Sequence, residues 1–484
     1  MIYTKHNLDD TIVALATPPG VGAIGVIRLS GKDAIAIADK VFFGKKLAKQ
    51  PTHTIHLGTI RNTEGSILDE VLAALFVAPK SYTKENVIEF SCHGSPFILQ
   101  QIIQLLINSG ARMAQAGEFT LRAFLNGQLD LSQAEAVADL IASTSEASHA
   151  LAMQQMRGGF SEKIKILRGQ LVNFASLIEL ELDFGEEDVE FANRDDLKVL
   201  ILDIQRLIKQ LLDSFSLGNV LKNGVSTVIA GRPNAGKSTL LNALLDEERA
   251  IVSDIAGTTR DTIEEILNIQ GVEFRLIDTA GIREATDTIE AMGVQKTMEK
   301  VDNSTILVYL FDVVEMKIMD VLADLIKLKR PNLKLIVVCN KMDKNPYFDP
   351  DWLINFHNPN IPEYYLGTIN PELNYPELTK KQIITLSAKH SMNVPYLTEK
   401  LYDLVADGAI QTDNVIVSNA RHFEALQKSH DSLTDVLRGM SSGITTDFVA
   451  MDIRRSLHHL GEITGDISTD DLLDTIFSKF CIGK

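Results

Sequence analysis

The chain has 484 residues, of which 47 are Lys or Arg and 64 are Asp or Glu, so its formal net charge is −17. This length corresponds to about three domains of roughly 100–200 residues each. The hydrophobic share of 45% and the charged share of 23% are those of a globular protein and exclude an intrinsically disordered chain. The negative net charge excludes a protein whose whole surface is covered with Lys and Arg, so any contact with nucleic acid must be confined to a small part of the surface.

The cysteines and the hydropathy indicate the compartment. Cys92, Cys339 and Cys481 lie far apart and form neither a disulfide framework nor a zinc cluster. No segment has the roughly 20 predominantly apolar residues that a membrane span needs. We therefore expect a cytoplasmic protein with no membrane contact, in which Cys92 and Cys339 are structural.

Residues 1–120 mix short strand patterns with amphipathic helical stretches such as Pro96–Leu106. This mixture predicts a compact α+β domain. The predicted strands are Ile12–Ala16, Ala23–Leu29, Val71–Val77 and Val87–Phe90.

Helical patterns dominate residues 121–220 and return in residues 411–484, through His422–Leu437 and Val449–Leu460. Ser132 and Glu135 have the spacing of a capping box at a helix start. The acidic run Glu179–Asp196 indicates a solvated loop between helices. The two segments together predict one discontinuous helical domain.

Residues 221–410 alternate strand and helix patterns, which is typical of a parallel α/β domain inserted between the helical segments. Within it, Asn345–Lys380 holds six of the 14 prolines and the only tryptophan, Trp352. This stretch is interpreted as a packed surface insertion, and whether it binds a partner stays open.

The strongest motif is a P-loop, Gly231-Arg-Pro-Asn-Ala-Gly-Lys-Ser238, between the strand pattern Val225–Ala230 and the helical pattern Ser238–Leu245. Backbone N–H groups at a helix N-terminus bind phosphates. Lys237 is expected to reach the β- and γ-phosphates and the Ser238 hydroxyl to bind Mg²⁺. The nucleotide-binding residues predicted from this loop are Asn234, Ala235, Gly236, Lys237, Ser238 and Thr239.

Three later motifs, each after a strand pattern, select GTP over ATP. Asp278 and Gly281 belong to Asp-Thr-Ala-Gly after Val272–Ile277, which places a carboxylate near Mg²⁺ and an amide near the γ-phosphate. The other two motifs follow Leu333–Cys339 and Ile383–Leu386. The carboxylate of Asp343, in the motif after Leu333–Cys339, can accept two hydrogen bonds from guanine, and adenine lacks the two donors that these bonds need. The residues of these two motifs are Asn340, Lys341, Asp343, Ser387 and Ala388. Together the motifs predict a Ras-like GTPase.

The segment Gly257-Thr-Thr-Arg-Asp261 lies between the P-loop and the Asp278 motif and is typical of a GTPase switch segment. We expect Thr259 of this segment to bind Mg²⁺. Ras-like GTPases carry a water-orienting glutamine where this chain has Ile282. Another residue must therefore orient the water, and an arginine finger or a monovalent cation must supply charge. The candidates from the sequence are Glu284, Asp287 and Glu290.

The combination of these motifs with the C-terminal Phe477-Ser-Lys-Phe-Cys-Ile-Gly-Lys484 resembles the tRNA-modification GTPase MnmE (TrmE) family over essentially the whole chain. The resemblance implies an N-terminal folate-binding domain, a discontinuous helical domain and an inserted GTPase domain, at residues 1–120, 121–220 with 411–484, and 221–410. It implies a homodimer that joins a FAD-dependent MnmG-type partner in a heterotetramer. Together they add an aminomethyl or carboxymethylaminomethyl group to C5 of the tRNA wobble uridine. The one-carbon donor is 5,10-methylene- or 5-formyl-tetrahydrofolate.

The resemblance also implies site residues. K⁺ replaces the arginine finger and is ringed by oxygens of Asn234, Ser253, Ile255 and Thr258, and Glu290 orients the water. Arg28, Glu85, Gln128 and Lys484 correspond to folate-binding positions, although the family often has Lys where this chain has Gln128. Cys481 is a candidate for direct chemistry, with a structural role as the alternative.

Two other functions stay open. One is a regulatory GTPase in ribosome assembly without one-carbon chemistry, and the other is a membrane-anchored switch lipidated at Cys481. The charge distribution bears on the choice, since residues 1–120 carry 11 basic and 10 acidic groups. The acidity therefore lies outside the domain expected to bind an anionic folate, and a partner is expected to supply much of the basic surface for tRNA.

Overall fold

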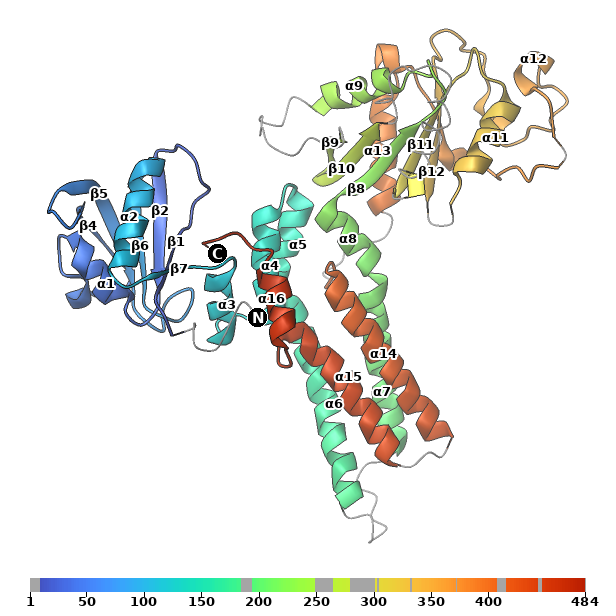
Figure 1. Cartoon of the computed structure of the whole chain (residues 1–484). Helices are drawn as coiled ribbons and strands as arrows, with labels where there is room; N and C mark the ends of the chain where they lie inside the picture. Colours follow the sequence, from blue (N-terminus) through green and yellow to red (C-terminus); the bar gives the residue numbers. More distant parts are fainter. Residues whose placement is uncertain are drawn as a thin grey trace. The chain divides into compact units, whose positions relative to one another are not determined.

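The computed structural model describes residues 9–183, 194–248, 264–278, 301–302, 304–330, 333–370, 372–406, 415–442 and 446–483. The chain forms two compact units. The first comprises Met1–Ala142, Ala152–Asp213 and Asn419–Lys484, and the second Ser143–Leu151 and Ser214–Ser418. The mixed α/β and helical architecture expected from the sequence is confirmed (Figure 1).

The N-terminal part of the first unit is a seven-stranded sheet of order β3-β4-β5-β6-β2-β1-β7. All neighbouring strands are antiparallel except β1 and β7. Two helices, α1 (Ala34–Val41) and α2 (Pro96–Asn108), pack their apolar residues against the sheet. The strands are β1 (Ile12–Leu15), β2 (Ile24–Ser30), β3 (Phe42–Phe43), β4 (Thr54–Arg61), β5 (Ile67–Phe76), β6 (Val87–His93) and β7 (Arg112–Met113).

The strands predicted in this part are confirmed, and the sheet has one long strand that the patterns do not predict. That strand is β4, which pairs with β5 along its whole length. Its apolar residues Ile55 and Leu57 point outward and are 66% and 63% exposed. The strand therefore lacks the usual alternation of buried apolar and exposed polar residues.

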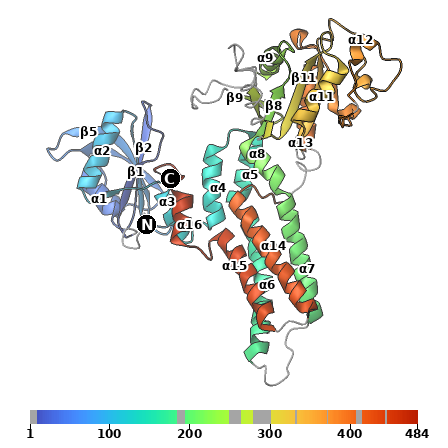
Figure 2. The ribbon, with the colours of Figure 1, turned by 45° about the vertical axis from the view of Figure 1, so that its right-hand side comes forward.

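The helical part of the first unit is a bundle of α6 (Gly159–Asp183), α7 (Arg194–Asp213), α14 (Ala420–Ser441) and α15 (Thr446–Thr464), which lie side by side in both views (Figure 2). Segments more than 200 residues apart in the sequence thus share one bundle, as Gln205 and Thr434 show by a 2.8 Å hydrogen bond. The shorter helices of this unit are α3 (Glu118–Leu125), α4 (Leu131–Ala142) and α16 (Asp470–Phe477), and α5 (Glu146–Met156) spans the boundary between the units.

Two local predictions in the helical part are wrong. The capping box lies at Asp130 and Gln133, whose side chains and backbone N–H groups exchange two hydrogen bonds of 3.0 Å. Ser132 lies inside α4 and is buried. Both ends of the predicted acidic loop are also helical, because Glu179–Asp183 lies in α6 and Arg194–Asp196 in α7, and the residues 184–193 between them lie outside the described residues.

The second unit is a six-stranded sheet of order β13-β12-β11-β8-β10-β9, parallel except for β9. Apolar clusters lie on both faces, as in a doubly wound α/β fold. The strands are β8 (Val225–Ala230), β9 (Glu264–Ile269), β10 (Val272–Asp278), β11 (Ile306–Asp312), β12 (Lys334–Asn340) and β13 (Ile383–Thr385). The helices are α8 (Phe215–Asn223), α9 (Lys237–Glu248), α11 (Ile318–Leu328), α12 (Glu363–Leu366) and α13 (Val394–Ala406).

The stretch Asn345–Lys380 packs against this domain, as interpreted from the sequence. Phe348 and Tyr365 are buried beside Phe311, and the rings of Phe348 and Trp352 meet edge to face at 5.5 Å. Many other side chains of the stretch face solvent, among them Tyr347 at 87% and Tyr364 at 67% exposure. Within the described part of the chain, no helix has the length and apolar character to cross a membrane.

Candidate functional site: a nucleotide site and a sheet-edge cavity

The phosphate loop connects β8 to α9 and depends on glycines at two close approaches. A Cβ at Gly231 would lie 2.1 Å from the carbonyl oxygen of Leu310, and one at Gly236 would lie 2.4 Å from Nδ2 of Asn340. Gly236 also has φ +100°, which side chains rarely adopt. The Lys237 ammonium donates hydrogen bonds to the carbonyls of Gly231 and Arg232, at 2.8 and 3.0 Å, and so lies over the loop.

Arg232 ties the loop to a neighbouring helix, a contact that sequence reasoning missed. Its guanidinium donates to both carboxylate oxygens of Asp324 on α11, at 2.8 and 3.2 Å. Tyr309 on β11 donates to the same carboxylate at 2.7 Å. Burial first, and then the charge of Asp324, raise the pKa of the Tyr309 hydroxyl, so it stays a donor.

Asn340 joins the phosphate loop to the two motifs expected to recognise guanine. Its Nδ2 donates to the Ala235 carbonyl at 2.8 Å, and its Oδ1 accepts from the Ala388 N–H at 3.0 Å. The side chain is buried, because Asn340 is only 2% exposed. One amide therefore brings together three predicted nucleotide-binding residues that lie far apart in the sequence.

Asp343 lies beside the Ser387 motif. The Ser387 hydroxyl donates to its Oδ1 at 2.6 Å, and this hydrogen bond lowers the pKa of the Asp343 carboxyl. The carboxylate is therefore ionised and can accept hydrogen bonds. Lys341, in the left-handed region at φ +65°, forms an ion pair of 2.5 Å with Asp312 at the end of β11. Side chains of β11, β12 and the segment after β13 thus converge at the carboxyl edge of the sheet, as ligand sites in such folds do.

Several predicted residues lie outside the described residues, and the structure places no contact for them. They are Ser253, Ile255, Thr258, Thr259, Gly281, Glu284, Asp287, Glu290 and Lys484, and of Asp278 only the backbone, at the end of β10, is described. Within the described ranges, no group of three or more His, Cys, Asp or Glu could hold a metal ion. Ser238 and Thr239 lie in the first turn of α9.

Arg28 and Glu85 lie in the N-terminal sheet domain in contact with other charged groups. The Arg28 Nε donates to Glu89 at 2.7 Å, and its NH1 donates to the carbonyl of Gly483 at 3.4 Å. Glu85 accepts from Ser30 at 2.6 Å and pairs with the buried Arg122 at 3.3 Å. The C-terminal segment therefore docks on the N-terminal domain.

The tail that carries Cys481 is fixed by backbone contacts. Ile482 forms an isolated bridge with Ala116, and a Cβ at Gly483, where φ is +99°, would lie 2.2 Å from the Leu15 carbonyl oxygen. Cys481 itself is exposed. Cys92 and Cys339 are buried, as predicted, and burial raises the pKa of the Cys92 thiol to about 12.

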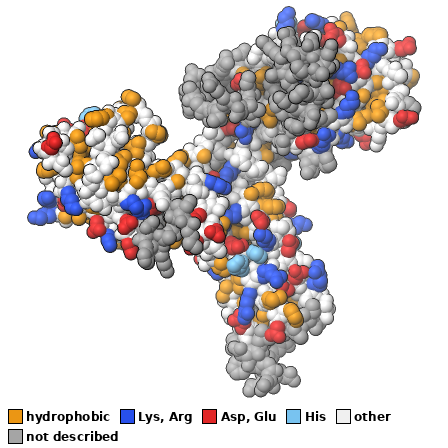
Figure 3. All heavy atoms as spheres, viewed as in Figure 1, with side chains coloured by type: hydrophobic (Ala, Val, Ile, Leu, Met, Phe, Trp, Pro, Cys, Tyr) orange, Lys and Arg blue, Asp and Glu red, His pale blue; other side chains and the backbone are white. Residues whose placement is uncertain are grey.

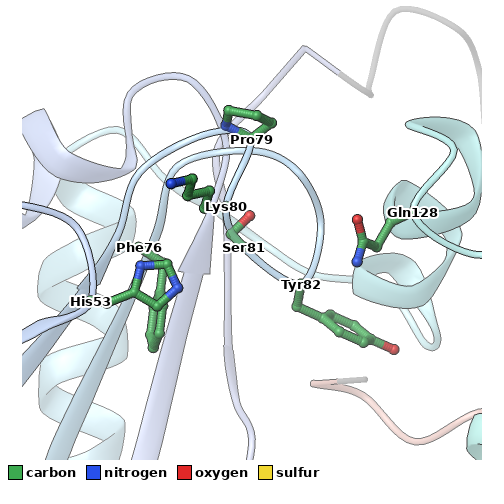
Figure 4. A pocket seen from close by; sticks show the side chains of 7 residues that line it. All are labelled: His53, Phe76, Pro79, Lys80, Ser81, Tyr82 and Gln128. Carbon is green, nitrogen blue, oxygen red and sulfur yellow. The ribbon is translucent and has the colours of Figure 1, made fainter.

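Gln128 lines a cavity of about 490 Å³ that is largely open to solvent, at the edge of the same domain (Figure 4). His53 and Phe76 form one wall, with their rings edge to face at 5.4 Å, and Tyr82 and Gln128 form the opposite side. The Tyr82 ring in turn lies 5.7 Å from the Arg28 guanidinium. The sequence singles out Gln128 but does not indicate the cavity, since five of its lining residues come from the strand end and loop Phe76–Tyr82.

Comparisons with known proteins cover nearly all of the chain. Residues 131–481 match the family described as "MnmE helical domain", and residues 11–128 match "GTP-binding protein TrmE N-terminus". The chain is 54% identical over 481 residues to the "tRNA modification GTPase MnmE" of Cytophaga hutchinsonii, covering 99% of each chain. It is 48% identical over 482 residues to the protein of that name from Bacteroides fragilis, covering 98% of this chain and all of that one.

A solved structure, the G domain of the T. maritima FeoB iron transporter, aligns with 38% of this chain and 98% of its own length, with 19% identity and a TM-score of 0.25. The full-length identity to the curated relatives and the two family matches agree with the resemblance drawn from the motifs. The chain belongs to the tRNA modification GTPase MnmE family.

Proposed function

We propose that this protein is a K⁺-dependent GTPase that modifies C5 of the tRNA wobble uridine, together with a FAD-dependent MnmG-type partner and a tetrahydrofolate one-carbon donor. The observation that carries the GTPase part is the Asn340 amide, which holds the phosphate loop against the Ser387-Ala388 motif beside the ionised Asp343. In the proposed division of labour, residues 1–120 bind folate, 121–220 and 411–484 form the helical scaffold, and 221–410 hydrolyse GTP.

The nucleotide is proposed to bind along the carboxyl edge of the parallel sheet. Lys237 and the loop amides would hold the phosphates, and Ser238 and Thr259 would bind Mg²⁺. Asp343 would accept from the guanine base, with the Ala388 N–H near O6. The full proposed set is Asn234, Ala235, Gly236, Lys237, Ser238, Thr239, Ser253, Thr258, Thr259, Asp278, Gly281, Asn340, Lys341, Asp343, Ser387 and Ala388.

Hydrolysis is proposed to need K⁺, held by oxygens of Asn234, Ser253, Ile255 and Thr258, with Glu290 orienting the water. Asn234 has the left-handed backbone conformation, φ +61°, in the phosphate loop, where its side chain is exposed and available. The test is GTP turnover at equal ionic strength in K⁺ and in Na⁺. Equal rates in the two salts would contradict the K⁺ proposal.

A folate donor fits the N-terminal domain by its chemistry. A folate combines an aromatic pterin with an anionic glutamate, and the domain offers Arg28, the Tyr82 ring and a cavity large enough for part of such a molecule. Arg28, Glu85, Gln128 and Lys484 are the proposed binding residues. When bound, the folate would supply the one-carbon unit, and the exposed Cys481 is positioned on the adjacent tail.

Calorimetric titration of the full chain with 5-formyl-tetrahydrofolate tests this part. A saturable heat is expected, whereas a ribosome-assembly GTPase, the second candidate function, would give none. Nucleoside analysis of tRNA from cells that lack the protein tests the whole proposal, because unmodified wobble uridine is expected. Normal modification in those cells would overturn it.

Dimerisation is proposed to use the N-terminal sheet. Ile55, Leu57 and Leu72 lie on the outer face of β4 and β5 and are 44% to 66% exposed, and Leu57 stands directly opposite Leu72. Figure 3 shows further hydrophobic side chains at the surface of this domain. Exposed apolar patches of this kind favour a protein interface. The mass of the protein in solution by light scattering should be that of a dimer, and Leu57→Asp should lower it to a monomer.

A further inference from the structure

The cavity at the edge of the N-terminal domain has a cationic and hydrogen-bonding lining without a carboxylate. None of its seven lining residues is acidic, and Lys80 is basic. An anionic ligand therefore suits it better than a cationic one. The lining residues are His53, Phe76, Pro79, Lys80, Ser81, Tyr82 and Gln128.

Lys80 supplies the formal charge of the cavity. Its side chain is exposed, and within the described residues it forms no ion pair. The carboxylate of Glu85, five residues further on, is already engaged by Ser30 and Arg122. The ammonium of Lys80 is thus available to a ligand.

His53 and Gln128 add donors on opposite sides of the cavity (Figure 4). Nδ1 of His53 lies 2.9 Å from the hydroxyl of Thr52, and the ring packs edge to face on Phe76. A hydroxyl that donates to Nδ1 leaves the ring hydrogen on Nε2, which can then donate to a ligand. The amide of Gln128 can donate as well.

Tyr82 connects this cavity to the residues proposed to bind folate. Its ring lines the cavity and also lies 5.7 Å from the Arg28 guanidinium, which contacts the Gly483 carbonyl. A ligand held at Arg28 could therefore extend past Tyr82 into the cavity. A folate has its carboxylates at the end far from the pterin, and each additional glutamate in its tail adds one more.

We propose that this cavity binds the oligoglutamate tail of the folate, with Lys80 pairing with a carboxylate and with His53 and Gln128 as hydrogen-bond donors. The proposal rests on the folate part of the proposed function and adds a preference for cofactors with several glutamates. Because an exposed ion pair contributes up to about 1 kcal/mol, the preference over the monoglutamate form should be roughly fivefold in Kd.

The test is calorimetric titration of the full chain with 5-formyl-tetrahydrofolate carrying one glutamate and carrying five. The unmodified protein should bind the pentaglutamate about fivefold more tightly. Lys80→Met should reduce this ratio to near one. Lys45→Met is the matched control, because it removes one exposed positive charge from the same domain outside the cavity and should keep the ratio.

The variant Gln128→Lys adds a second cation to the cavity and should increase the preference for the pentaglutamate over the monoglutamate form. Misfolding would not produce such an increase. Equal affinity of the unmodified protein for the two forms would overturn the inference and leave the folate proposal standing. Absence of heat with either form would overturn the folate proposal itself. If Lys80→Met instead weakened tRNA binding at constant salt and left the folate ratio unchanged, the cavity would be a phosphate contact for RNA and the inference would be wrong.

Discussion

The Asn340 side chain donates a hydrogen bond of 2.8 Å to the carbonyl of Ala235, which is 105 residues earlier in the chain. Ala235 belongs to the phosphate loop and Asn340 ends β12, so this contact fixes the distance between the phosphate-binding and base-binding ends of the nucleotide site. The same amide also accepts from the Ala388 N–H. The amide of Asn340 thus links the phosphate loop to the segment that carries Ala388.

Asn340→Ala should therefore abolish tight nucleotide binding. It leaves the Ala235 carbonyl and the Ala388 N–H without this partner in a region where both residues are at most 3% exposed. Each buried polar group left unsatisfied costs about 1–3 kcal/mol. The measurement is the Kd for a fluorescent GDP analogue, combined with the thermal unfolding temperature.

Asn345→Ala is the control for this variant. Asn345 also donates two side-chain hydrogen bonds, to the Tyr365 hydroxyl at 2.6 Å and the Val313 carbonyl at 3.3 Å, but it does not contact the phosphate loop. It should lower the unfolding temperature and leave the affinity for GDP nearly unchanged. Equal losses of affinity in both variants would show that Asn340 acts only through stability.

Ser387→Ala should change the pH dependence of guanine binding. The Ser387 hydroxyl lowers the pKa of Asp343, so the carboxylate remains an acceptor as the pH falls. Without it, the pKa rises toward the ordinary value of about 3.9. Protonation then occurs at higher pH on acidification, and the acid limb of GDP binding should shift upward. Asp343→Asn should show no such limb in its residual binding, because an amide does not titrate.

The convergence of the phosphate loop with the Asn340 and Ser387 motifs could be predicted from the sequence because each motif is local. Each motif directly follows a strand pattern, and the carboxyl ends of parallel strands lie along one edge of a sheet, so Gly236, Asn340 and Ser387 could be assigned together. The contact between Arg232 and Asp324 could not be predicted in this way, because no local pattern shows that the acidic face of α11, with Asp320 and Asp324, packs beside the loop.

The misplaced capping box has a related cause. Asp130 with Gln133 and Ser132 with Glu135 both have the spacing of a capping box, and the pattern alone does not separate them. Tertiary contacts decide which of the two pairs forms the capping box. Glu135 is 9% exposed and pairs with Arg421 and His422, which are almost 300 residues away in the sequence. A residue with a long-range partner is not free to cap its own helix.

Glu135→Gln should destabilise the junction of the two helical segments. Glu135 on α4 accepts from Arg421 at 2.7 Å and lies 2.8 Å from Nε2 of His422, both on α14. Loss of one partner from a buried ion pair costs about 3–5 kcal/mol. The measurement is hydrogen exchange of the α4 and α14 amides, which should accelerate. Glu424→Gln, in an exposed pair with Lys428 on α14, should change exchange very little.

The same junction should weaken in acid. Burial alone would raise the pKa of Glu135, but the charge of His422 and the hydrogen bonds from His422 and Arg421 lower it to about 2. A carboxyl whose pKa is lower in the folded than in the unfolded protein stabilises the fold. This stabilisation is complete above the unfolded pKa of about 4.3, and it is lost as the pH falls from that value toward the pKa of the folded state. The difference between Glu135→Gln and the unmodified protein should therefore shrink below about pH 4.

Gly483→Ala should detach the C-terminal tail from the N-terminal domain. The new Cβ would lie 2.2 Å from the Leu15 carbonyl oxygen, and the backbone at φ +99° disfavours a side chain. The tail must then move, and the hydrogen bond from Arg28 to the Gly483 carbonyl is lost with it. We expect faster carboxypeptidase cleavage and a loss of about tenfold in affinity for 5-formyl-tetrahydrofolate, as for one lost hydrogen bond to a charged group. Gly169→Ala, where no atom lies within 4 Å of the added Cβ, is the matched control and should leave both unchanged. Faster cleavage with unchanged folate affinity would show that the tail docks on the domain without taking part in the site.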